Sequence, residues 1–137
     1  MYQGVAHPEC GNTVKIIVRL LYRFKRSGIP FRLAAWHCGT AENFNPLDGA
    51  VTLTADAPQK QVNALLEAEF AVLDKEIADA RYAGQMHIET GVRAQKALSA
   101  EDSAALLTLL WLMPNNLYHE TESEALTINN VGLLSLE

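Results

Sequence analysis

The chain has 137 residues, which favours a single domain with one hydrophobic core. Hydrophobic residues make up 49% of the chain, and 16 acidic residues against 11 basic ones give a net charge of -5. This composition excludes a disordered chain, and the negative net charge disfavours a nucleic-acid partner. No apolar run approaches the length of about 20 residues that a membrane span needs. No secretory signal opens the chain and two cysteines are too few for a disulfide framework, so we expect a protein of the reducing cytoplasm.

A first helix is predicted between Asn12 and Gly28. Asn12 is a suitable N-cap, Gly28 is a suitable helix end, and Pro30 prevents the helix from continuing. We interpret the basic stripe on one face of this helix as a solvated surface. The stripe consists of Lys15, Arg19, Arg23 and Arg26.

Two β-prone segments follow the first helix, over residues 31–38 and 50–55, and a long connection rich in Gly, Asn and Pro joins them. A second helix is then predicted from a capping box formed by Asp56 and Gln59. Its apolar residues repeat at helical spacing until Gly84 ends the pattern.

The last part of the chain is predicted to contain two further strands and a third helix. Residues 86–92 alternate as a strand does, and Ser99 with Asp102 opens a helix that runs through Met113. The segment 125–137 has the composition of a final strand.

The resulting order of elements predicts an α+β fold of ferredoxin-like type, a two-layer sandwich in which helices cover one face of a mainly antiparallel sheet. A ferredoxin-like unit normally opens with a strand, and residues 1–11 are too short and too broken by Gly and Pro to supply one. We therefore expect residues 1–137 to be one domain whose N-terminus is cut.

The residues on their own predict no catalytic set and no metal site in this chain. His7 and Cys10 have the spacing of a ligand pair, but a zinc site needs three or more converging donors and no second pair completes the set. A cysteine nucleophile stays open. His37 is badly placed to activate Cys38, because adjacent residues in a strand point to opposite faces.

Three segments, in this order and spacing, resemble one known family. They are AHPECGNTVKIIVRLLYRF, RLAAWHCGTAENFNPLDGAVTLTA and MPNNLYHETESEALTINNVGLL. The most specific part is Gly39-Thr40 followed by Asn43-x-x-Pro46 and a strand. Together the segments resemble the inserted lid, or dimerisation domain, of aminoacyl-histidine dipeptidases (peptidase D), a carnosinase-like cytosolic branch of the two-zinc exopeptidases.

This resemblance implies a zinc-dependent dipeptidase that hydrolyses Xaa-His dipeptides, with zinc held by a flanking catalytic domain and none held by this chain. The family's zinc ligands are a His-x-Asp pair, a Glu-Glu pair, a bridging Asp and a late His, and this chain contains none of them. The implied partners are the flanking catalytic domain, a second lid in a homodimer, and the dipeptide substrate. The resemblance thus implies that residues 1–137 are one domain excised from a larger metallopeptidase, and the chain alone is expected to be inactive.

The resemblance also implies three substrate-binding residues. Asn43 matches the lid asparagine whose amide can donate to the substrate carboxylate, although a structural role in capping the turn before Pro46 is the alternative. His7 matches the second of two lid histidines by its distance from Gly11-Asn12, and the first, which stabilises the oxyanion, would fall at Met1. His119 stands where the family has an arginine.

Two further departures separate the chain from the family pattern. His37-Cys38 replaces a Gly-Gly pair, and Glu42 replaces an arginine before Asn43. Loss of both arginines weakens the binding of a peptide carboxylate, so a divergent specificity or a reduced activity stays open. The alternative function is a free-standing ferredoxin-like module for oligomerisation or small-ligand binding, without peptidase activity.

Overall fold

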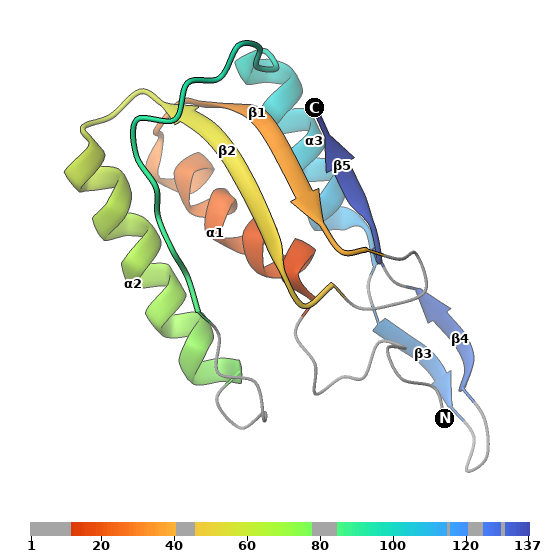
Figure 1. Cartoon of the computed structure of the whole chain (residues 1–137). Coiled ribbons are helices and arrows are strands. Elements are labelled where there is room, and N and C mark those ends of the chain that lie inside the picture. Colours follow the sequence, from red (N-terminus) through yellow and green to blue (C-terminus); the bar gives the residue numbers. More distant parts are fainter. Residues whose placement is uncertain (1–11, 41–45, 78–84, 115, 121–124, 130) are drawn as a thin grey trace.

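Helices and a small antiparallel sheet form the two layers of the domain, which confirms the α+β class (Figure 1). The computed structural model describes residues 12–40, 46–77, 85–114, 116–120, 125–129 and 131–137, and it describes only the backbone of the strands between 116 and 129. The elements in chain order are α1 (Thr13–Ser27), β1 (Phe31–Cys38), β2 (Gly49–Ala55), α2 (Gln59–Ile77), α3 (Ala100–Leu112), β3 (Asn116–Glu120), β4 (Ala125–Asn129) and β5 (Leu134–Leu136).

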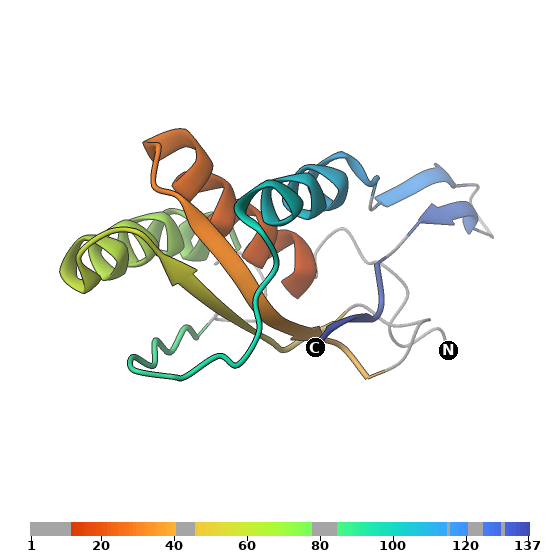
Figure 2. The same cartoon turned by 90° about the horizontal axis from the view of Figure 1, so that it is seen from above.

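The three helices lie on the same side of the sheet, as the view from above shows (Figure 2). The core fills the space between the two layers, because α1 is amphipathic and turns its apolar face toward β1 and α3. The largest fully buried side chains come from all three elements: Leu21 and Phe24 of α1, Leu33 and Trp36 of β1, and Leu107 of α3.

The caps predicted for α1 are confirmed. Asn12 is the N-cap, and its side-chain oxygen accepts a hydrogen bond from the backbone N–H of Lys15 at 3.3 Å. Gly28 ends the helix in the left-handed conformation with φ of 68°, and its N–H returns to the carbonyl of Lys25. Pro30 follows, so the chain leaves the helix and enters β1 at the predicted residue.

The sheet has the strand order β2-β1-β5, and both pairs are antiparallel. β5 covers only the end of β1, from Trp36 to Cys38. Nearer the start of β1, Leu33 donates its N–H to the hydroxyl of Ser103 at 2.9 Å and accepts from the N–H of Leu98 at 2.7 Å. The beginning of α3 is therefore fastened to β1 where β5 does not reach.

The predicted strand over residues 86–92 is wrong. The alternation itself is present, since Met86 and Ile88 are half-buried while His87 and Glu89 are exposed. However, this segment pairs with no strand in the described part of the chain, and Gly91 bends it with a φ of 77°. An alternating pattern becomes a strand only where a neighbouring edge accepts its backbone hydrogen bonds.

The final strand predicted over 125–137 is also wrong as a single element. It divides into β4 and β5, and these belong to different sheets, because β4 pairs with β3 in a separate two-stranded ribbon. β3 has no counterpart among the predicted strands. The main sheet has three strands among the described residues, one fewer than a ferredoxin-like unit contains.

The second and third helices differ in how well the sequence predicts where they start. At α3 the hydroxyl of Ser99 accepts from the N–H of Asp102 at 2.9 Å, as expected. At α2 the carbonyl of Pro58 receives the first helical N–H groups, so the helix starts after Pro58 rather than at a capping box on Asp56. None of the helices in the described residues is long and apolar enough to cross a membrane.

The interpretation of the basic stripe on α1 as solvated surface is wrong for most of its length. The Nη2 of Arg19 donates to Glu76 at 3.0 Å and its Nε to Glu69 at 3.1 Å, while the Nε of Arg23 lies 3.0 Å from the second oxygen of Glu69. Lys15 donates to backbone carbonyls at the end of α3. The stripe therefore joins α1 to both neighbouring helices, with partners about 50 or more residues away that no local pattern reveals.

Candidate functional site

The three segments that carry the family resemblance meet at the N-terminal end of α1. The side-chain amide of Asn12 donates to the carbonyl of Val131 at 3.1 Å, and the N–H of Thr13 donates to the carbonyl of Pro46 at 3.1 Å. Asn12 is only 5% exposed and Pro46 is buried. We call this meeting point the α1 corner and define it by Asn12, Gly39, Pro46, Val131 and Gly132.

Two glycines let the backbones of the α1 corner come into contact. Gly39, directly after β1, has a φ of 76°, and a Cβ built there would overlap the carbonyl oxygen of Gly132 and lie 3.2 Å from the Cβ of Pro46. The N–H of Gly39 points to the carbonyl of Asp48 at 3.4 Å. The corner therefore has no room for a side chain at Gly39, and it holds the chain on both sides of residues 41–45.

Of the three predicted site residues, the structure describes only the backbone of His119. His7 and Asn43 lie outside the described residues. Pro46, three positions after Asn43, belongs to the α1 corner, and Thr40, three positions before it, adjoins the corner. The backbone of His119 lies in β3 opposite Thr127, and the pairing is irregular on both sides of it. Irregular pairing of this kind is frequent next to functional sites.

Sequence reasoning missed the second role of Asn12 and the contact made by Val131 and Gly132. The available signal is the Asn-Asn-x-Gly sequence at 129–132, which periodicity assigns only to a strand. This short segment ties the end of the β3-β4 ribbon to the start of α1, because Val131 follows β4 closely and bonds to Asn12.

Cys38 is unsuited to be a nucleophile. It is only 2% exposed, and the indole N–H of Trp36 donates to its sulfur at 3.2 Å. Burial raises the pKa of the Cys38 thiol above its ordinary value of 9.0, and the charge of Asp48 acts in the same direction. His37 points to the exposed face, where its Nδ1 lies 3.3 Å from the hydroxyl of Ser135, as the alternation of strand side chains predicted.

The raised pKa of Cys38 predicts a loss of stability in alkaline solution. The unfolded chain releases the thiol proton near pH 9 while the folded chain still holds it, so the folded state binds more protons and the free energy of unfolding falls as the pH rises above about 9. The test is urea unfolding at pH 8 to 10 of a Cys10→Ser variant and of the Cys10→Ser, Cys38→Ser double variant. As the pH rises, the free energy of unfolding of the single variant should fall more steeply than that of the double variant, by up to about 1 kcal/mol per pH unit. Equal slopes, or rapid alkylation of Cys38 in the folded protein, would restore Cys38 as a candidate nucleophile.

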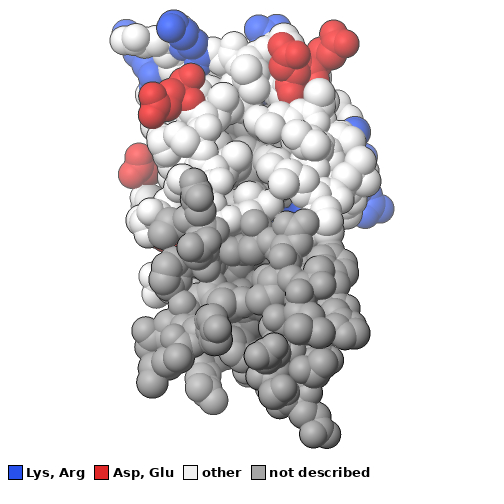
Figure 3. Space-filling view, turned by 90° about the vertical axis from the view of Figure 1, so that its right-hand side faces the viewer, with Lys and Arg blue, Asp and Glu red and all other residues white. Residues whose placement is uncertain are grey.

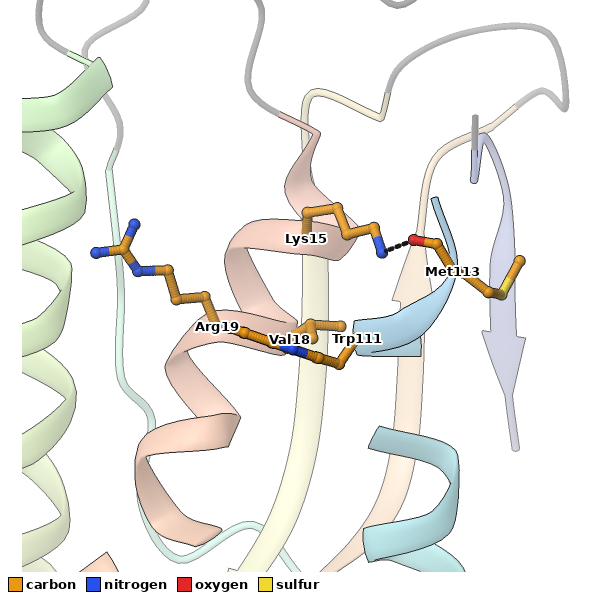
Figure 4. Close-up of a pocket in the computed structure, with 5 residues that line it drawn as sticks. All are labelled: Lys15, Val18, Arg19, Trp111 and Met113. Carbon is orange, nitrogen blue, oxygen red and sulfur yellow. Dashed lines mark hydrogen bonds between the residues drawn. The ribbon is translucent and has the colours of Figure 1, made fainter. Parts of the chain in front are cut away.

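An open hollow of about 320 Å³ lies between α1 and the end of α3 (Figure 4). Its lining residues are Lys15, Val18, Arg19, Trp111 and Met113. Both cations already have partners, because Lys15 donates to the carbonyls of Leu110 and Met113 and Arg19 binds Glu76. Figure 4 shows Arg19 directed away from Met113, toward α2. The hollow therefore offers apolar walls and no unengaged cation for an anionic substrate.

The comparisons with known proteins assign no family. No family model matches the chain, and no curated protein matches it. Within the described ranges, no group of three or more His, Cys, Asp or Glu side chains could hold a metal ion. The residues that the structure does bring together are those of the three resembling segments at the α1 corner.

Proposed function

We propose that this domain is the lid and dimerisation domain of a zinc-dependent dipeptidase acting on Xaa-His dipeptides. The observation that carries the proposal is the α1 corner, where one residue from each resembling segment takes part: Asn12, Pro46 and Val131. Segments that resemble a family in scattered parts of a sequence are expected to meet in space if they support one site. Their meeting supports a common role more strongly than any one motif does.

The finer fold is part of this proposal. A ferredoxin-like unit has four strands, and the outer edge of β2 pairs with no strand among the described residues. In the proposed enzyme a strand that precedes α1 pairs with this edge and completes the sheet. A complete sheet covered by helices on one face gives the lid a rigid support for its substrate-binding turn.

In the proposed enzyme the flanking catalytic domain would hold zinc, which would activate water for hydrolysis of the peptide bond. This chain contributes binding and orientation. The amide of Asn43 donates to the substrate carboxylate, and the α1 corner holds the chain on both sides of residues 41–45. His7 and His119 are the further polar side chains that the lid brings to the substrate.

The natural reading frame provides the first test. The dipeptidase proposal requires catalytic-domain sequence on both sides of this segment, including a His-x-Asp pair and a Glu-Glu pair. A reading frame without them would reject the proposal and leave the free-standing oligomerisation or small-ligand module.

In the full-length enzyme, Asn43→Ala is expected to lower kcat/KM for an Xaa-His dipeptide by about tenfold or more and to leave the melting temperature nearly unchanged. The size follows from loss of one hydrogen bond to a charged group, about 1.5 to 3 kcal/mol. Steady-state kinetics and thermal unfolding should be measured on the same preparation. Asn63→Ala on α2 is the matched control, since Asn63 bonds only to the neighbouring side chain of Gln59 among its described side-chain contacts.

The alternative role of Asn43 gives the opposite pattern. An asparagine that only caps its turn lowers stability by about 1 kcal/mol when it is removed and leaves the kinetics unchanged. That combination would remove Asn43 from the substrate site while the reading-frame test continues to decide the family.

A further inference from the structure

The second half of α2 is attached to the domain differently from the first half. Three apolar side chains of the first half belong to the hydrophobic core or pack against it: Val62, Leu65 and Leu66. Beyond them, the next described residue that packs with this core is Leu98, well after the helix has ended. We call residues 67–77 the α2 arm. Among its described side chains, Leu73 is the only buried apolar one.

Ion pairs join the α2 arm to α1. Glu69 lies between two arginines: its Oε1 accepts from the Nε of Arg19 at 3.1 Å, and its Oε2 lies 3.0 Å from the Nε of Arg23. Glu76, two turns further along α2, accepts from the Nη2 of Arg19 at 3.0 Å. The side chain of Glu69 is only 12% exposed, so water screens its pairs less than those of a surface carboxylate.

The two partners carry opposite charges along their whole lengths. α1 has five basic and no acidic side chains, whereas the α2 arm has four acidic side chains and one basic side chain. α1 lies between α2 and α3 in both views of the fold (Figures 1 and 2), so it is the helix that the arm faces. The attraction between the arm and α1 therefore extends beyond the ion pairs themselves.

The α3 side of the domain is held by other means. Leu107 and Leu110 are buried in the core, and the hydroxyl of Ser103 accepts from the N–H of Leu33. No ion pair joins α3 to another element among the described side chains. Figure 3, seen from the right-hand side of Figure 1, shows charged side chains only toward the margins of the described surface. α3 is thus an internal reference that does not depend on ion pairs.

We propose that the α2 arm is a releasable element, which leaves α1 when the charges of Glu69 and Glu76 are screened or removed, while the rest of the domain stays folded. The inference does not depend on the dipeptidase proposal. Release frees Arg19 and Arg23 from their carboxylate partners. Isolated helices shorter than about 12 residues are marginal in water, so the released arm also loses its helical hydrogen bonds.

The attachments of the chain before and after the arm permit this movement. The first half of α2 keeps its apolar contacts with the core. After the arm, the N–H of Leu98 donates to the carbonyl of Leu33 at 2.7 Å, which fixes the chain before α3 begins. The arm can therefore leave α1 without disturbing the core cluster or the sheet.

Hydrogen exchange of the full chain, followed by mass spectrometry, tests the proposal in salt. Raising NaCl from about 0.01 M to about 1 M shortens the screening length from about 30 Å to about 3 Å. Amide exchange in the α2 arm is expected to rise about threefold to tenfold, while exchange in α1 and α3 stays the same. An equal rise in all three helices would show general destabilisation and overturn the proposal.

Charge-removing variants test which carboxylates hold the arm. Glu69→Gln is expected to speed exchange in the arm about tenfold at low salt, because two arginines lose their shared partner. In the Glu69→Gln, Glu76→Gln double variant, added salt should cause no further rise. Circular dichroism verifies that each variant is folded, and the salt response of the wild type decides the question if one is not.

Glu67→Gln is the matched control. Glu67 belongs to the same arm and is exposed, and no described residue forms an ion pair with it. This variant should exchange within about twofold of the wild type. Equal acceleration by Glu67→Gln and Glu69→Gln would indicate a general effect of charge and reject the proposal. Exchange in the Glu69→Gln arm that matches the wild type would also reject it, since apolar contacts would then hold the arm.

Discussion

Replacing Gly39 with alanine is expected to lower the free energy of unfolding by about 2 to 5 kcal/mol, through two causes at the α1 corner. A residue with a side chain at a φ of 76° costs roughly 1 to 2 kcal/mol. The new Cβ would also overlap the carbonyl oxygen of Gly132, so the backbone must move, at a further cost of about 1 to 3 kcal/mol. Urea unfolding monitored by circular dichroism measures the sum.

Gly28→Ala separates the two causes. Gly28 has a similar φ of 68°, but a Cβ there would have no atom within 4 Å. The loss of stability in Gly28→Ala should therefore come from backbone strain alone, about 1 kcal/mol. Equal losses in the two variants would show that the close approach of Gly39 and Gly132 contributes nothing to stability.

In the proposed dipeptidase, Gly39→Ala should also reduce activity, because the displaced backbone lies only four positions before Asn43 in the chain. The expected reduction appears in kcat/KM at a temperature where the variant is still folded. Gly28→Ala, at the opposite end of α1, should leave the kinetics unchanged.

Replacing Asn12 with alanine is expected to lower the free energy of unfolding by about 1.5 to 5 kcal/mol. Loss of the N-cap of α1 accounts for about 0.5 to 2 kcal/mol, and loss of the buried donor to the Val131 carbonyl accounts for about 1 to 3 kcal/mol. The control is Ser99→Ala at the exposed start of α3, where loss of the cap alone should cost about 1 kcal/mol.

Asn12→Asp isolates the contact with Val131. The carboxylate can still accept from the N–H of Lys15 and is favourable at a helix N-terminus, but it has no donor for the carbonyl of Val131. We expect this variant to lie well below the wild type in stability despite its intact cap. If Asn12→Asp is instead as stable as the wild type, the cap is the whole contribution of Asn12.

Much of the fold follows from local sequence. Asn12 and Gly28 bound α1, Ser99 opens α3, and the strand over 31–38 has the predicted residues, since each boundary depends on groups only a few positions apart. The opposite directions of His37 and Cys38 follow in the same way from the period of a strand. These features need no knowledge of the partner elements.

The errors occur where a pattern depends on a distant partner. The alternating residues 86–92 have no strand beside them in the described part of the chain, and the segment 125–137 is divided between two sheets, which periodicity alone cannot indicate. Arg19 and Arg23 form ion pairs with Glu69 from α2, although both arginine side chains remain partly exposed to solvent. The candidate site was identified by resemblance, and of its residues only the backbone of His119 lies in the described part of the chain.

The sequence by itself determined the α+β class, the ends of α1 and the start of α3, and the segments that resemble a peptidase lid, because caps, periodicity and ordered motifs are local properties. Only the tertiary structure decided that these segments meet. Asn12 must find the carbonyl of Val131 across 119 positions of chain, and Gly39 must approach Gly132. Such contacts are selected by the packing of whole helices and strands around one core, which no short stretch of residues specifies.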